Sequence, residues 1–100
     1  MKLHGDEHPD TASSYHNIGR IQYAMDGYVS ALQSHQQALN IRLKLHGDEH
    51  PDTAISYNSI GLTQYAKRDY DLAVLFFQEA NNVWFKIYGE EYPIFYIGKQ

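Results

Sequence analysis

A ten-residue segment, Leu3 to Ala12, returns without a change at Leu45 to Ala54, and a weaker third copy begins at Ile87. The starts are 42 residues apart each time. Self-similarity at a fixed spacing indicates stacked copies of one supersecondary unit, each too small to bury its own core. Residues 3–44 and 45–86 share 23 identities in 42 aligned positions. We therefore predict one domain with two repeats and a degenerate third start over residues 87–100.

Each repeat is predicted to be a pair of antiparallel helices. Pro9 and Pro51 suit the first helical position, where the missing N–H would lack a partner anyway. Asp26-Gly27 is a helix stop and a tight turn. Apolar and small residues at i, i+3, i+4, i+7 and i+8 define the packing face of the first helix in each repeat. These are Tyr15, Ile18, Gly19, Gln22 and Tyr23, repeated as Tyr57, Ile60, Gly61, Gln64 and Tyr65. The expected helices cover about residues 9–25, 28–45, 51–67 and 70–87.

Two glycines lie inside the expected first helices, Gly19 and Gly61. A glycine there costs about 1 kcal/mol relative to alanine. Their equivalent positions predict that a neighbouring element approaches closely at both. Ala31 and Ala38, two turns apart, are expected to allow the same close approach from the second helix.

Composition excludes several classes of function. The net charge is -4 and the eight Lys and Arg are scattered, which argues against nucleic acid as a partner. There is no cysteine, hence no disulfide and no thiolate ligand, as is typical of an intracellular protein, and we expect a cytoplasmic one. No apolar run is long enough to span a membrane, and the first residues do not resemble a signal region.

The sequence contains no convincing catalytic or metal-binding motif. His4/His8 and His46/His50 are each four apart, but Gly5, Pro9, Gly47 and Pro51 interrupt any helix that would place them on one face. We therefore expect no native metal site, with adventitious binding by a loop more plausible, and no cofactor. The acidic residues beside Pro9 fit the positive end of a helix dipole better than a metal loop. No phosphate-binding glycine loop, nucleophile elbow or HExxH motif is present, so an enzyme is not expected.

Seven positions in each repeat carry a family resemblance. They are Tyr15, Ile18, Gly19, Tyr28, Ala31, His35 and Ala38, echoed by Tyr57, Ile60, Gly61, Tyr70, Ala73, Phe77 and Ala80. This pattern resembles the tetratricopeptide repeat, with His35 in place of the usual aromatic. The 42-residue period and the Gly-Asp-Glu-His-Pro-Asp loop look like the repeats of kinesin light chains and their relatives. The resemblance implies an all-α solenoid of two helix-turn-helix hairpins plus a short C-terminal helical tail.

The resemblance also implies a non-enzymatic scaffold whose first helices line a concave groove for an extended peptide or a partner helix. The groove candidates by position are Ser13, His16, Asn17, Arg20, Tyr23, Ile55, Asn58, Ser59, Leu62 and Tyr65. Asn17 is similar to an asparagine that can bond a peptide backbone in those relatives, and Arg20 could hold a carboxylate. The alternative is that these polar residues are simply a solvated helix face. Leu62 in place of a second Arg20 argues against a clamp for chaperone tails.

The last helix is unusually aromatic. A terminal solenoid helix normally has a polar outer face, whereas an exposed aromatic patch marks an interface. The candidates for self-association are Phe76, Phe77, Trp84, Phe85, Phe95 and Tyr96. Three explanations remain open: the tail covers this helix, a second copy covers it in a homodimer, or the chain is part of a longer array. The rival function is thus a self-assembling structural unit.

Overall fold

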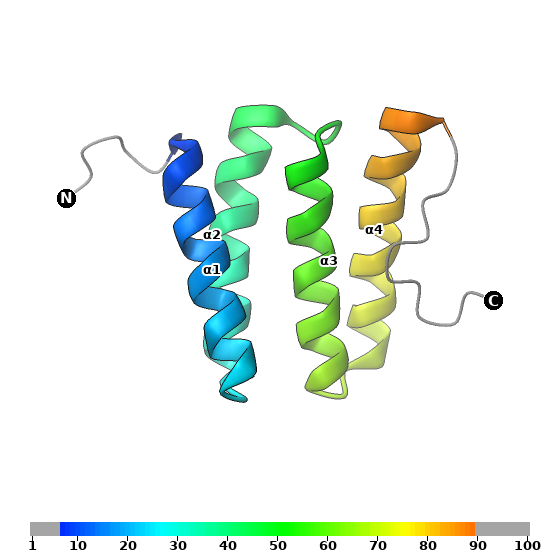
Figure 1. Cartoon of the computed structure of the whole chain (residues 1–100). Coiled ribbons are helices and arrows are strands. Elements are labelled where there is room, and N and C mark those ends of the chain that lie inside the picture. The colour runs from blue at the N-terminus through cyan, green and yellow to red at the C-terminus, as the bar shows by residue number, and fades with distance from the viewer. Residues whose placement is uncertain (1–6, 90–100) are drawn as a thin grey trace.

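The computed structural model describes residues 7–89, which form four helices in sequence (Figure 1). They are α1 (Pro9–Ala24), α2 (Tyr28–His46), α3 (Pro51–Ala66) and α4 (Tyr70–Tyr88). Both ends of every helix lie within one residue of the predicted bounds, and the all-α helical-hairpin architecture is confirmed. The tail, with Phe95 and Tyr96, lies outside the described residues.

The helices are arranged as two antiparallel hairpins placed side by side. Within each hairpin the helices pack along their length, and α2 packs against α3 to join the hairpins. Figure 1 shows α1 and α3 on the near side, with α2 and α4 behind them. The first helices of both repeats therefore share one face, as the solenoid prediction requires.

Histidine side chains cap the first helix of each repeat. Pro9 and Pro51 occupy the first turn, as predicted. His8 Nδ1 accepts a hydrogen bond from the Asp10 amide at 3.0 Å, and His50 Nδ1 accepts one from the Asp52 amide at 3.0 Å. Each bond satisfies an amide that a helix start leaves without an intrahelical partner.

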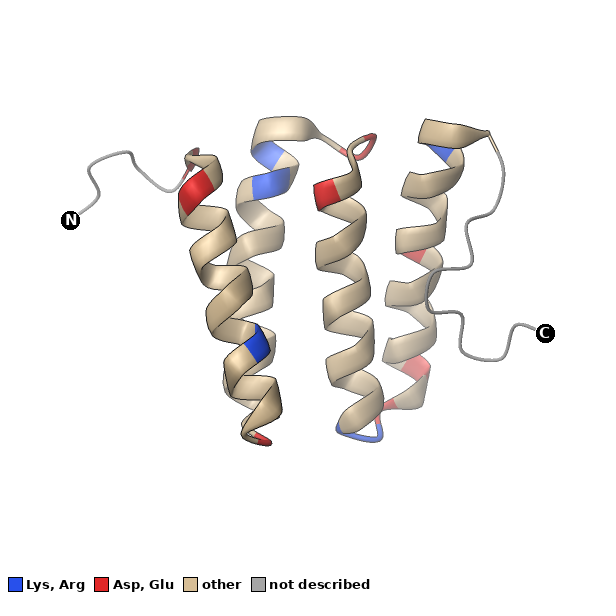
Figure 2. Ribbon diagram, in the orientation of Figure 1, with Lys and Arg blue, Asp and Glu red and all other residues tan. Residues whose placement is uncertain are grey.

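Charged side chains gather near helix ends (Figure 2). The first turns of α1, α3 and α4 each hold an aspartate, and Lys44 and Lys86 lie in the last turns of α2 and α4. These signs complement the helix dipoles.

The predicted close approach at the two helical glycines is confirmed. A Cβ built on Gly19 would lie 2.7 Å from Cε1 of His35, and one on Gly61 would lie 2.7 Å from Cε1 of Phe77. Both distances are shorter than van der Waals contact, so any side chain at these positions would displace the ring. The small residues expected to bring the helices together, Ala31 and Ala38, are fully buried.

Three members of the expected packing faces, Ile18, Tyr23 and Tyr65, are more than a third exposed, and only Ile18 differs in this from its equivalent. Ile18 of α1 is 45% exposed, whereas its equivalent Ile60 of α3 is 2% exposed. The reason is position in the array: α3 packs extensively against both α2 and α4, while α1 packs extensively against α2 alone. The isoleucine position of the stripe is therefore core in the second repeat and surface in the first.

Candidate peptide-binding groove

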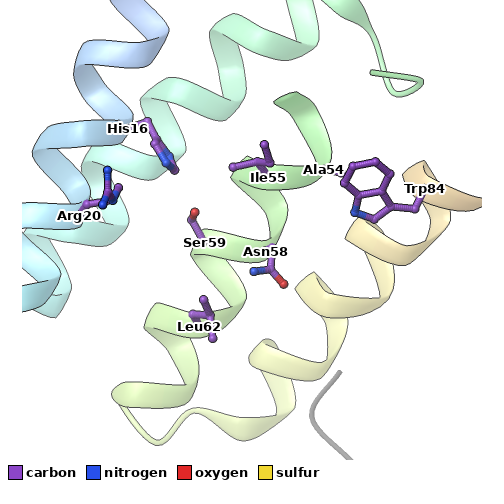
Figure 3. Close-up of a pocket in the computed structure, with 8 residues that line it drawn as sticks. All are labelled: His16, Arg20, Ala54, Ile55, Asn58, Ser59, Leu62 and Trp84. Atoms are coloured by element: carbon purple, nitrogen blue, oxygen red, sulfur yellow. The ribbon is translucent and has the colours of Figure 1, made fainter. Parts of the chain in front are cut away.

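A hollow of about 270 Å³ lies between α1 and α3, with one wall contributed by α4 (Figure 3). Its lining residues are His16, Arg20, Ala54, Ile55, Asn58, Ser59, Leu62 and Trp84. Six of these eight are among the groove candidates named from the sequence. The lining mixes a guanidinium, an amide and a hydroxyl with isoleucine, leucine and tryptophan.

Helical spacing produces this lining. On α1, His16 and Arg20 are four residues apart and so lie on one face. On α3, Ile55, Asn58 and Leu62 follow each other at intervals of three and four. Because α1 and α3 run side by side with the same polarity in the array, these two stripes face one hollow.

Two further hollows continue from the first. One of about 200 Å³ is lined by Arg20, Tyr23, His35, Ser59, Leu62 and Thr63, and one of about 490 Å³ by Asn17, Arg20, Ile21 and Ala24. Arg20 lines all three. Ser13 and Tyr65 line none of them, although both side chains are exposed.

Asn17 does not occupy the place expected for it. Its hollow is lined by α1 alone, so the amide is not beside α3. The amide in the main hollow belongs to Asn58, which is buried and comes from the second repeat. The residue that can hydrogen bond a main chain there is therefore Asn58.

Histidine chemistry distinguishes the first repeat. Burial lowers the pKa of His35 to about 4, with His16 and Arg42 acting in the same direction. Burial, Arg42 and Arg20 lower the pKa of His16, opposed by Asp52. The two rings lie 5.2 Å apart, and among the described residues the buried Nδ1 atoms of both make no hydrogen bond. Both imidazoles are therefore neutral at pH 7.

Arg20 is the cation of the groove. It is exposed and forms no ion pair with any residue between 7 and 89. A guanidinium is always charged and presents donors that match a carboxylate. The first-repeat side of the groove thus offers charge, and the second-repeat side offers apolar surface at Ile55 and Leu62.

The sequence did not assign Trp84, Ala54, His35 and Thr63 to the groove. Trp84 was expected on an outer surface, because it replaces Arg42 of the first repeat. In the structure it is buried with Ala54 and Val83 and also borders the main hollow. The available signal for its burial was the residue type itself: Trp84 is a large apolar residue at the position where the first repeat has Arg42.

The aromatic residues assigned to self-association differ in exposure. Phe77 is buried against Gly61 and Trp84 is buried in the core. Phe76 is half-buried, with its ring 6.4 Å from that of Tyr57. Phe85 is 54% exposed. Among the described members of the set, only Phe85 is therefore a mainly exposed side chain.

Comparison with protein families identifies the repeats. A family model described as tetratricopeptide repeat matches residues 1–44 and residues 26–83. The chain belongs to the tetratricopeptide repeat family. Comparison with curated proteins finds no match. Tetratricopeptide repeats generally mediate protein–protein interaction, and the family typically provides non-enzymatic scaffolds. No helix in the described part of the chain is long and apolar enough to cross a membrane.

Proposed function

We propose that this chain is a protein-interaction module that binds a peptide or a partner helix in the groove between α1 and α3. The observation that carries the proposal is the position of Arg20, a cation with no ion pair among residues 7–89, which borders all three hollows and faces an apolar wall. A ligand with a carboxylate next to an apolar side chain complements this surface.

The lining supplies each type of contact that such a ligand needs. Arg20 pairs with the carboxylate, Leu62 and Ile55 cover the apolar side chain, and the Asn58 amide offers a donor and an acceptor to the main chain. The neutral His16 adds no second positive charge, so Arg20 alone would select for a carboxylate in the ligand.

A peptide selection tests the proposal. Random peptides displayed on phage are selected on the purified chain, and the affinity of each synthetic peptide is measured by fluorescence anisotropy. Arg20→Ala is expected to weaken acidic peptides about tenfold, the scale of one lost hydrogen bond to a charged group. Leu62→Glu is expected to abolish binding through repulsion of the carboxylate.

A matched control keeps this test specific. Lys67→Ala removes the same charge from an exposed position at the end of α3. Its affinity is expected to stay within twofold of the parent. Equal losses of affinity for Arg20→Ala and Lys67→Ala would refute groove binding. So would selected peptides that shift the protein's backbone amide resonances in α2 instead of α1 and α3.

We infer a second candidate function, association of two copies through α4, from one observation. Leu75, Phe85 and Tyr88 of α4 are each more than half exposed, whereas α2, its equivalent, packs against the next helix.

Light scattering after size exclusion should then show a dimer that dissociates on dilution. Phe85→Asp should give a folded monomer, while Val29→Asp, an equally exposed apolar site on α2, should leave the dimer. A folded monomer at every concentration contradicts this candidate.

A further inference from the structure

The loop between α2 and α3 brings three metal-ligating side chains together. His46 ends α2, His50 caps α3, and Asp52 lies in the first turn of α3. One ligand atom from each lies within 4.8 Å of the other two. His46 Nε2 is 3.9 Å from Asp52 Oδ2, and His50 Nδ1 is 4.0 Å from the same oxygen. The sequence argued against a metal site because His46 and His50 do not share one helix. The loop nevertheless brings their side chains together with Asp52.

The two imidazole rings are stacked, with centroids 3.7 Å apart and an angle of 13° between their planes. Because the nitrogen lone pairs lie in the ring planes, both rings must turn out of this parallel arrangement before their nitrogens can point at one ion. Neutral imidazole is the form that binds metal.

Several contacts hold this loop in one conformation. Gly47 has a φ of +71°, which favours glycine. Thr53, which is fully buried, donates from Oγ1 to the Gly47 carbonyl at 2.8 Å. The Asp52 amide donates to His50 Nδ1, and Arg42 donates to the Asp52 carbonyl at 3.4 Å. Preorganised ligands lose little conformational freedom on binding an ion.

We propose that His46, His50 and Asp52 form a binding site for a divalent transition metal ion of the zinc class. Two imidazoles and one carboxylate are the ligand set of many zinc centres, and they leave a fourth position for water. Ligand atoms around a tetrahedral zinc lie about 3.3 Å apart, so the two distances to Asp52 Oδ2, 3.9 Å and 4.0 Å, must shorten by roughly 0.6–0.7 Å. All three side chains are partly exposed, so they can rotate to provide this movement, which includes turning the two stacked rings relative to each other.

Metal binding at His50 Nδ1 requires a change in its hydrogen bonding. That lone pair now accepts the Asp52 amide proton, so the ion replaces the cap bond at the start of α3. Arg42 is the nearest opposing charge, and its guanidinium is directed to Ser56 Oγ at 2.9 Å. We therefore expect moderate affinity, with zinc binding linked to the end of one helix and the start of the next.

The test is a titration of the full chain with Zn²⁺ alone, in a buffer that does not coordinate metal. The expected result is binding that shifts the side-chain nitrogen resonances of His46 and His50 and leaves those of His16 and His35 unchanged. Two conservative variants remove one ligand each. His46→Gln and Asp52→Asn are both expected to weaken zinc binding about tenfold or more.

The controls come from the repeat itself. His4→Gln removes the sequence equivalent of His46 and should leave the affinity within twofold. Asp52→Asn retains the backbone amide that His50 caps, so it should fold, as circular dichroism will show. His50→Asn keeps a side-chain acceptor for that amide and serves as a second variant that separates the ligand role from the cap.

Two results would overturn the proposal. One is an unchanged affinity in both His46→Gln and Asp52→Asn. The other is a loss in His4→Gln as large as that in His46→Gln, which would indicate adventitious binding by exposed histidines only.

Discussion

In the first repeat an imidazole, His35, lies over Gly19, and in the second a phenyl ring, Phe77, lies over Gly61, each 2.7 Å from where a Cβ on the glycine would be. Both rings are buried. The geometry of the hairpin is therefore the same while the chemistry of its centre differs. A flat ring over a glycine satisfies the packing in both cases, but only the histidine brings a titratable group and a buried nitrogen without a hydrogen bond among the described residues.

A second pair of equivalent positions shows the same divergence. Arg42 is buried and reaches from α2 into α3, where Nη1 donates to Ser56 Oγ at 2.9 Å. Trp84 is buried in the apolar cluster with Ala54 and Val83. The first repeat thus contacts its neighbour through a polar side chain, and the second has an apolar core. One repeat scaffold therefore accepts either a hydrogen-bonded polar side chain or an apolar one at this position.

The largest expected effect on stability is at Trp84, the apolar member of this pair. Trp84→Ala should lower the free energy of unfolding by about 3–5 kcal/mol, because it removes the largest side chain of the cluster and leaves a cavity. Chemical denaturation followed by circular dichroism measures the change. Phe85→Ala, the exposed neighbour, should change stability by about 0.5 kcal/mol or less. Similar losses for the two variants would contradict the packing of α4 described above.

The next effect tests the polar connection between repeats. Arg42→Ala should cost about 1–3 kcal/mol, because the Ser56 hydroxyl and the Asp52 carbonyl lose a buried donor. Ser56→Ala in the Arg42→Ala background should cost less than Ser56→Ala alone, since the partner is already gone. A double-mutant cycle in urea measures this coupling. Strictly additive losses would mean that the two side chains do not interact.

Acid should destabilise the first repeat through His35. Its pKa is about 4 in the folded protein and ordinarily 6.5, so the unfolded chain binds more protons between these values. Stability is full above pH 6.5 and falls as the pH drops toward 4, by about 1–2 kcal/mol at pH 5. Denaturation at pH 7 and pH 5 measures the loss.

His35→Phe supplies the control, because phenylalanine already fills the equivalent place in the second repeat. The variant should fold and lose most of the difference in stability between pH 7 and pH 5. What remains belongs to other groups, among them His16, whose pKa is also lowered. An undiminished acid loss in His35→Phe would contradict a buried neutral His35.

Local sequence signals predicted the helices well. Proline at the helix starts, the period of the apolar residues and the two helical glycines depend on residues close in the chain, and all were confirmed. The caps show where local reasoning ends. His8 and His50 cap their helices through ring nitrogens, although histidine is not among the residues that usually signal a cap. Asp26, and not the following Gly27, adopts the positive φ at the end of the first hairpin's turn.

The groove was harder to predict, because it depends on packing between repeats. Stripes on α1 and α3 were read correctly from spacing, and six of the eight residues lining the main hollow were named. Trp84 was missed because its burial depends on Ala54 in the preceding helix. Asn17, also predicted for the groove, lines a hollow formed by residues of α1 alone, while the amide lining the main hollow is that of Asn58. Ile18 shows the same limit: identical patterns are buried or exposed according to the number of neighbours.

The smallest expected effect concerns the ion pairs that join each loop to the second helix of its repeat. Lys44 lies 3.5 Å from Glu7 in the first repeat, and the equivalent Lys86 pairs with Asp48 in the second. All four groups are substantially exposed, and exposed pairs lose most of their Coulomb energy to water and salt. Lys44→Met and Lys86→Met should each shift the melting temperature by only about 1 °C, and 0.5 M NaCl should remove any difference from the parent protein.

A larger, salt-resistant loss of stability in Lys86→Met alone would mean that the second loop depends on its lysine in a way the first does not. Equal small losses would place the difference between the repeats in their buried rings and at the position shared by Arg42 and Trp84, not on their surfaces.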